Sequence, residues 1–126
     1  LERKLGISFG PCDLFVNVAG GVQLSEPSAD LAVCAALVSS HLNEPVPPGA
    51  LVFGEVGLAG EVRGVTATET RLAEGAKMGF ELAYLPATNL RRLEKPALPS
   101  VGVFELREVL EALFPSLAEP VRVVKG

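Results

Sequence analysis

Short strand-like segments alternate with helical segments along this chain, and this alternation limits the folds that it can adopt. The strand-like segments are rich in apolar and β-branched residues and are bounded by glycine or proline, which is typical of buried strands. Strands and helices that alternate over one core form layers, so the sequence predicts an α/β (or layered α+β) fold. The strands are expected at residues 13–18, 81–85 and 101–104, and the helices at residues 31–42, 68–78 and 106–114.

The connections between these segments carry their own signals. A β-hairpin is predicted at residues 51–65, with a tight turn near Ala59 and Gly60. Thr66 is followed three positions later by Glu69, the spacing of a capping box that would begin the helix at 68–78. Ser25 is expected to cap the helix at 31–42. Two smaller helical pieces are expected, the end of a helix at residues 1–5 and one turn at residues 89–94.

Composition excludes several classes of protein. With 126 residues, of which 48% are hydrophobic, the chain has the length and the apolar content of one globular domain. It holds no run of about 18 apolar residues, so no membrane span is predicted. The formal net charge of −4 argues against tight, autonomous binding of nucleic acid, although it leaves room for a local basic patch.

Few of the residues suit metal binding or nucleophilic catalysis. The 2 cysteines lack CxxC spacing and there is 1 histidine, so neither a disulfide scaffold nor a metal site is predicted, and a reducing, cytoplasmic location is expected. Cys34 and His41 fall on one predicted helix, roughly 10 Å apart along its axis, which is too far for a thiol–imidazole pair. The phosphate-binding GxxxxGK[ST] motif is missing.

Three blocks of sequence, at residues 16–32, 52–63 and 69–80, carry a family resemblance. In order and spacing they resemble the C-terminal domain of the RadA (Sms) family of bacterial DNA-repair proteins, which is similar to the proteolytic domain of Lon protease. The resemblance implies a Lon-protease-like fold (ribosomal protein S5 domain 2-like) for a single domain at 1–126. It also implies a longer parent protein with a zinc ribbon and a RecA-like ATPase, which would bind Zn and ATP with Mg.

The resemblance to Lon can be followed at the positions of its Ser–Lys dyad. The dyad serine matches Ser28, within Pro27-Ser-Ala-Asp30, although Asp30 stands where Lon has glycine. The dyad lysine is replaced by Glu69, and Arg71 cannot act as a base because a guanidinium stays protonated in proteins. This fragment is therefore expected to be no enzyme, and a Ser28-dependent peptidase remains the enzymatic alternative.

Basic residues are scarce, so their positions are informative. Arg91, Arg92 and Lys95 form a cluster, and Arg71 follows the predicted hairpin. These four residues are the candidates for contact with DNA, which would make the chain a DNA-contacting module. A solvated loop, or ion pairs with acidic residues of a neighbouring subunit, is the alternative. For Arg122 and Lys125, in the tail, this alternative is preferred to contact with DNA.

The preferred function is assembly. Leu58 lies in the predicted turn between short strands, where its own domain offers little to pack against, and Glu55, Glu61 and Arg63 flank it. We expect these residues to form an apolar contact with a polar rim in a homo-oligomer, which the resemblance implies is a hexameric ring. The resemblance also implies a parent that is an ATP-driven motor for DNA branch migration in homologous recombination, and RecA recombinase as a partner.

Overall fold

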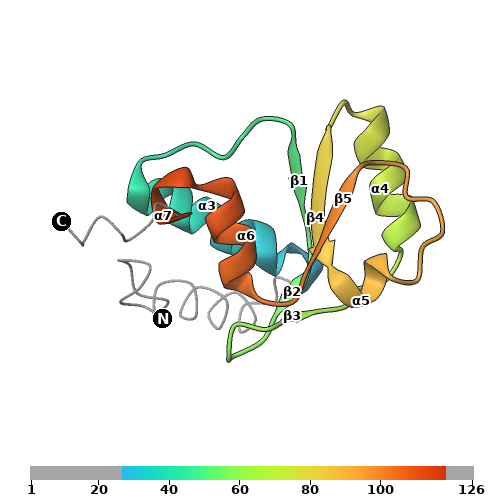
Figure 1. Cartoon of the computed structure of the whole chain (residues 1–126), viewed down its shortest axis with the longest axis horizontal. Helices are drawn as coiled ribbons and strands as arrows, with labels where there is room; N and C mark the ends of the chain where they lie inside the picture. Colours follow the sequence, from blue (N-terminus) through green and yellow to red (C-terminus); the bar gives the residue numbers. More distant parts are fainter. Residues whose placement is uncertain (1–26, 119–126) are drawn as a thin grey trace.

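The computed structural model describes residues 27–118, apart from the side chains of Pro27 and Ala118. The predicted strand at 13–18, the helix end at 1–5, and Arg122 and Lys125 lie outside the described residues. The predicted Ser25 cap is wrong, because the helix that begins at Asp30 has Ala29 as its N-cap. Within the described range the chain forms a three-stranded parallel sheet flanked by helices (Figure 1). The predicted α/β class is confirmed, and the more specific Lon-like fold stays a prediction.

The parallel sheet has the strand order β1-β4-β5, formed by β1 (Ala50–Val52), β4 (Leu82–Pro86) and β5 (Ser100–Val103). The register pairs Ala50 with Leu82 and Ala83 with Ser100. Every residue of β4 after Leu82 is buried, as expected for the central strand of a sheet covered on both faces.

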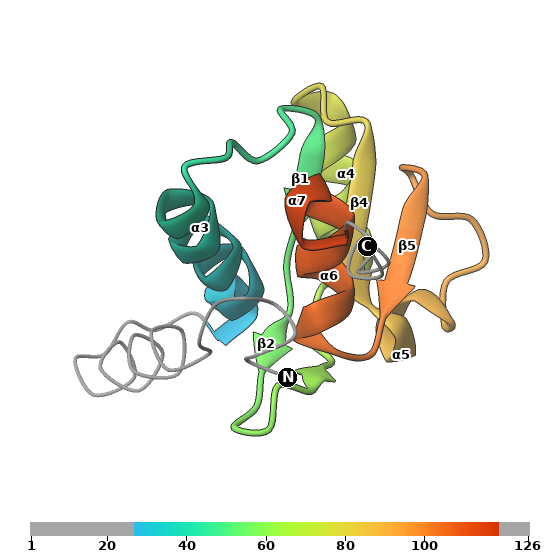
Figure 2. The same cartoon turned by 60° about the vertical axis from the view of Figure 1, so that its left-hand side comes forward.

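The helices cover both faces of this sheet. In Figures 1 and 2, α3 (Asp30–Leu42) and α6 (Leu106–Leu113) lie on one side, and α4 (Thr68–Lys77) and the short α5 (Ala87–Leu90) lie on the other. A 3-10 turn, η1 (Pro27–Ala29), leads into α3, and a last short helix, α7 (Pro115–Ala118), follows α6. None of the helices in the described part of the chain is long and apolar enough to cross a membrane.

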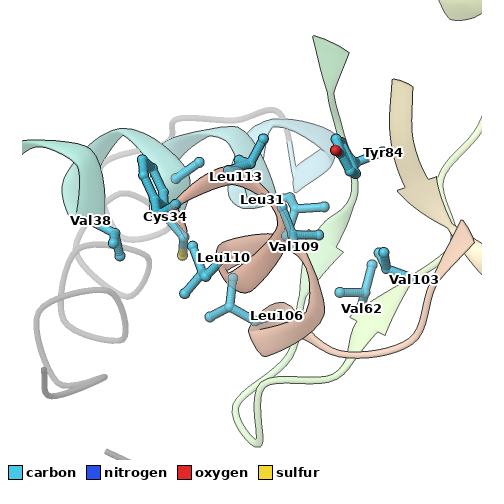
Figure 3. Close-up of a cluster of buried hydrophobic side chains, with 12 residues drawn as sticks. Leu31, Cys34, Val38, Val62, Tyr84, Val103, Leu106, Val109, Leu110 and Leu113 are labelled. Atoms are coloured by element: carbon cyan, nitrogen blue, oxygen red, sulfur yellow. The ribbon is translucent and has the colours of Figure 1, made fainter. Parts of the chain in front are cut away.

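Two hydrophobic clusters hold the layers together, one on each face, because strand side chains alternate between faces. Tyr84 of β4 joins the cluster of α3 and α6, which Figure 3 shows around Leu31, Leu110 and Val109. Its neighbours Ala83 and Leu85 join the second cluster. The second cluster also contains Phe53, Leu72 and Leu98.

The amphipathic pattern at 106–114 predicted α6 closely. Leu106, Val109, Leu110 and Leu113 are buried along one stripe, and Phe114, which directly follows the helix, is fully buried as well. Glu105 caps the helix through a capping box with Glu108. The predicted helices at 31–42 and 68–78 are likewise present as α3 and α4.

The predicted hairpin at 51–65 needs a correction, because its first strand is broken. Residues 50–52 belong to the parallel sheet, whereas β2 (Glu55–Val56) pairs with β3 (Val62–Arg63) in a separate antiparallel hairpin. Gly54 makes the break with φ = 153°, a backbone conformation that side chains disfavour. The chain therefore changes sheets at Gly54.

The predicted capping box of Thr66 and Glu69 is also wrong. The N-cap of α4 is Ala67, which adopts a left-handed conformation (φ = 56°) and makes no side-chain cap hydrogen bond. The carbonyl of Thr66 accepts a hydrogen bond from Arg71 instead. The loop that precedes α4 is thus not held by the predicted capping motif.

Candidate functional site

The β2–β3 hairpin projects from the body of the protein, at the bottom of both views in Figures 1 and 2. Two backbone hydrogen bonds close its turn, from Gly57 N to Glu61 O (2.8 Å) and from Gly60 N to Gly57 O (3.0 Å). Leu58 lies in this turn and is 79% exposed, the largest exposure among the large apolar side chains of the described residues. The structure therefore presents Leu58 on an ordered turn.

Charged side chains flank the turn. Arg63 donates to Glu61 at 2.7 Å, and this hydrogen bond, the largest cause, holds the pKa of the Glu61 carboxyl below its usual range. Glu61 also accepts a hydrogen bond from the backbone N–H of Ala59. Glu55 stands opposite Arg63 in the strand register. The four predicted interface residues, Leu58, Glu55, Glu61 and Arg63, thus lie on one hairpin.

Backbone hydrogen bonds join the hairpin to the β5–α6 junction. Val62 N donates to Phe104 O and Leu106 N donates to Gly60 O, both at 2.8 Å. Phe104 lies at this junction and is 58% exposed. The predicted strand at 101–104 included Phe104, but β5 ends at Val103, and the exposure of Phe104 was not predicted.

Ser28 lies in η1, on the face of the sheet that α3 covers. It is 7% exposed, and its carbonyl accepts a hydrogen bond from Gly54 N at 2.8 Å. Glu69 lies instead in the first turn of α4, which packs on the opposite face. Glu69 lines a surface hollow, and Ser28 is not part of that lining.

The hollow beside Glu69 has a volume of about 390 Å³ and lies at the N-terminus of α4. Asn89 belongs to its lining, and the side-chain amide of Asn89 forms two hydrogen bonds with the backbone of Val65. Val65 N donates to Asn89 Oδ1 at 2.8 Å, and Asn89 Nδ2 donates to Val65 O at 2.9 Å. Neither the hollow nor the role of Asn89 was predicted. The polar side chains that line the hollow are those of Thr68, Glu69, Thr70, Asn89 and Arg92.

The four basic residues predicted for DNA contact differ in their surroundings. Arg71 donates to Thr66 O at 2.9 Å and lies 5.7 Å from the centre of the Phe53 ring, a cation–π contact. Arg92 lines the hollow, whereas Arg91 and Lys95 are exposed outside it. None of these last three side chains makes an ion pair with a residue in the described range.

The other residues considered for chemistry lie apart. Cys34 is buried in the core beneath α6, whereas His41 is exposed near the end of α3. Within residues 27–118, no group of three or more His, Cys, Asp or Glu side chains is placed to hold a metal ion.

Comparison with known proteins gives one consistent result. The chain is 45% identical over 113 residues to the DNA repair protein RadA of Haemophilus influenzae, an alignment that covers 90% of this chain and 24% of that protein. It is 44% identical over 110 residues to the Escherichia coli protein of the same name, and 41% identical over 115 residues to the one from Streptococcus pyogenes serotype M6. The chain thus spans about a quarter of the length of these relatives. No family model matches it.

Proposed function

Because this chain is homologous, over about 90% of its length, to a segment of the bacterial proteins named DNA repair protein RadA, we propose that it is the non-proteolytic assembly domain of a DNA repair protein of that kind. The parent would be a cytoplasmic, ATP-driven motor that carries a zinc ribbon and promotes branch migration in homologous recombination. Its partners would be DNA and the RecA recombinase. The domain would have a Lon-like fold and would join copies of the chain into a hexameric ring.

The exposed Leu58 at the tip of the hairpin is the observation that carries the proposal. A side chain of this size that is 79% exposed on an ordered turn is well placed for burial in a partner. Glu55, Glu61 and Arg63 surround it with charge, which is the usual arrangement of an apolar centre and a polar rim. A projecting hairpin that fits a different surface of the next copy makes a heterologous contact, and such contacts close into rings when the rotation allows.

The anchoring of the hairpin supports the same function. Its strand β3 is held by Val62 N–Phe104 O and Leu106 N–Gly60 O, so the hairpin has little freedom to lose on binding. The exposed ring of Phe104, at the junction that these bonds fix, adds a second apolar group on this side of the domain. We assign both side chains to the contact between subunits.

The test is a charge placed at the tip. Leu58→Asp should convert the assembled chain into monomers with an unchanged circular dichroism spectrum, because Leu58 contributes little to the core. Met78→Asp is the matched control, since Met78 is 72% exposed at the end of α4, away from the hairpin. Mass measured by light scattering over a range of concentrations gives the readout. A wild-type monomer at high concentration, or assembly of Leu58→Asp equal to that of Met78→Asp, would refute the proposal.

The absence of proteolysis is a separate part of the proposal. A serine nucleophile needs a base within hydrogen-bonding reach. Glu69, at the position of the Lon lysine, lines a hollow to which Ser28 does not contribute. We expect no peptidase activity and no reaction of Ser28 with a serine-directed phosphonate, detected by mass spectrometry. Stoichiometric labelling that disappears in Ser28→Ala would contradict this expectation.

Contact with DNA is the second candidate function, and the exposure of Arg91 and Lys95 favours it. Side chains without an ion pair in the described range are available to phosphates, and Arg92 lies next to them. If all three meet the backbone, neutralising them should lower the slope of log affinity against log salt by about 0.9 per lost contact. An unchanged slope and affinity in the triple variant would remove this cluster from DNA contact.

A further inference from the structure

The side chain of Thr68 is nearly buried, yet its hydroxyl group has no hydrogen-bond partner among residues 27–118. Thr68 is 8% exposed and makes no side-chain hydrogen bond with any residue that the structure describes. Among those residues, every side-chain oxygen or nitrogen that is shielded from solvent has a hydrogen-bond partner. The Thr68 hydroxyl must therefore keep contact with open space, and Thr68 lines the hollow of about 390 Å³.

The start of α4 contributes further donors to the same hollow. The first N–H groups of a helix have no partner within the helix, and a side chain of the N-cap residue usually accepts from one of them. The N-cap here is Ala67, whose side chain offers no acceptor, and the Asn89 amide is engaged with Val65. The backbone of Thr68 and its neighbours is thus left to donate into a space that carries the positive end of the helix dipole.

Two charged side chains complete the lining. Arg92 brings a guanidinium group that makes no ion pair with a described residue, and it enters from the turn after α5. Glu69 also lines the hollow but lies farther than 4.0 Å from any basic group of the described residues, Arg92 included. The hollow therefore combines a hydroxyl donor, helix N–H groups and a guanidinium group with one opposing carboxylate.

We propose that this hollow binds a phosphoryl group, with Thr68 and the first N–H groups of α4 as hydrogen-bond donors and Arg92 as the counter-charge. Phosphate suits this set because its oxygens accept from several donors at once and a helix N-terminus favours an anion. Glu69 repels the same anion and keeps the affinity low. The site lies on α4 and α5, away from the hairpin, so it does not depend on the assembly proposal.

The test is an amide-resolved NMR titration of the chain with inorganic phosphate. Shifts should appear at the amides of Thr68, Glu69 and Thr70. Arg92→Gln should weaken binding about tenfold, and Thr68→Val should weaken it by about threefold or more, as expected for lost hydrogen bonds to a charged ligand. Glu69→Gln should tighten binding about two- to fivefold, since it removes a like charge near the helix end. Lys77→Gln, at the other end of α4, is the control for a change of charge and should alter affinity less than twofold.

Two further probes identify the source of the phosphoryl group. A short oligothymidylate that shifts the same amides, with a response lost in Arg92→Gln, supports the backbone of a nucleic acid strand. A response to thymidine monophosphate without one to the oligonucleotide supports a free nucleotide. No shift at the α4 amides with any of the three probes would overturn the proposal, and so would equal weakening by Lys77→Gln and Arg92→Gln. Unchanged assembly by light scattering in Arg92→Gln separates this outcome from failure of the ring contact.

Discussion

Gly54, where the chain passes from the parallel sheet to the hairpin, should tolerate a side chain poorly, because it combines a positive φ with close buried neighbours. Its N–H donates to Ser28 O at 2.8 Å and its carbonyl accepts from Leu31 N at 3.0 Å. These bonds fix both its position and its φ of 153°. We expect Gly54→Ala to destabilise the protein more than an alanine at any glycine that has open space around it.

The magnitude follows from two contributions. A side chain at this φ costs about 1–3 kcal/mol of backbone strain. A Cβ atom at Gly54 would also lie 3.2 Å from Pro86 Cγ, 3.2 Å from Val62 Cγ1 and 3.3 Å from Leu31 Cδ2. Leu31 and Pro86 are fully buried and cannot move freely, so crowding adds about 1–3 kcal/mol. The free energy of unfolding should fall by about 2–6 kcal/mol.

Gly60→Ala separates these contributions. Gly60 also has a positive φ, 88°, but a Cβ there would meet nothing within 4 Å. It should lose only the backbone part, about 1–2 kcal/mol. Urea unfolding followed by circular dichroism, at one protein concentration, gives both values from the midpoints if the m-values agree. Equal losses for Gly54→Ala and Gly60→Ala would refute the crowding of Gly54 by its buried neighbours.

Two further substitutions test other features. Ala67→Gly should stabilise the protein by about 0.5–1 kcal/mol, because relief of a left-handed alanine outweighs the greater flexibility of unfolded glycine; a lower melting temperature would contradict this. Burial raises the pKa of Asp30 above 3.8, with the nearby charge of Glu55 adding to the effect and the hydrogen bond from Val56 N opposing it. The folded protein therefore holds the Asp30 proton more tightly than the unfolded chain does. Protonation of Asp30 contributes fully to the stability of the fold below the pKa of the unfolded state, and this contribution is lost as the pH rises through the pKa of the folded state. Asp30→Asn, which can still accept from Val56 N, should therefore gain stability relative to wild type from acidic to neutral pH; a difference in urea midpoints that does not change with pH would contradict this.

The elements that sequence predicted well are those whose signal is local and long. The stripe of Leu106, Val109, Leu110 and Leu113 spans the whole of α6, and burial on a single face requires that period. β4 was equally clear, because five apolar residues that end in a proline suit a central strand. The exposure of Leu58 also followed from local sequence, since a tight turn leaves its side chains outside.

The features that sequence missed depend on residues far apart in the chain. The Thr66–Glu69 spacing fits a capping box, but Asn89, 24 positions further along the chain, holds the backbone of Val65, so the loop takes another shape. The break at Gly54 arises because residues 50–52 pair with β4, which lies beyond α4 in sequence. The hollow was invisible for the same reason, as it forms only where the start of α4 meets the turn after α5.

The two hydrogen bonds between the hairpin and the β5–α6 junction also connect the tip of the hairpin mechanically to the rest of the molecule. A push on Leu58 loads the hydrogen bonds from Val62 to Phe104 and from Leu106 to Gly60. Phe104 directly follows β5, and Leu106 begins α6, so the load enters a strand and a helix at the same place. The hairpin is therefore tied to both a strand and a helix of the body of the protein. In the assembly proposed above, a neighbour that pulled on the hairpin would load β5 and α6 through these two hydrogen bonds.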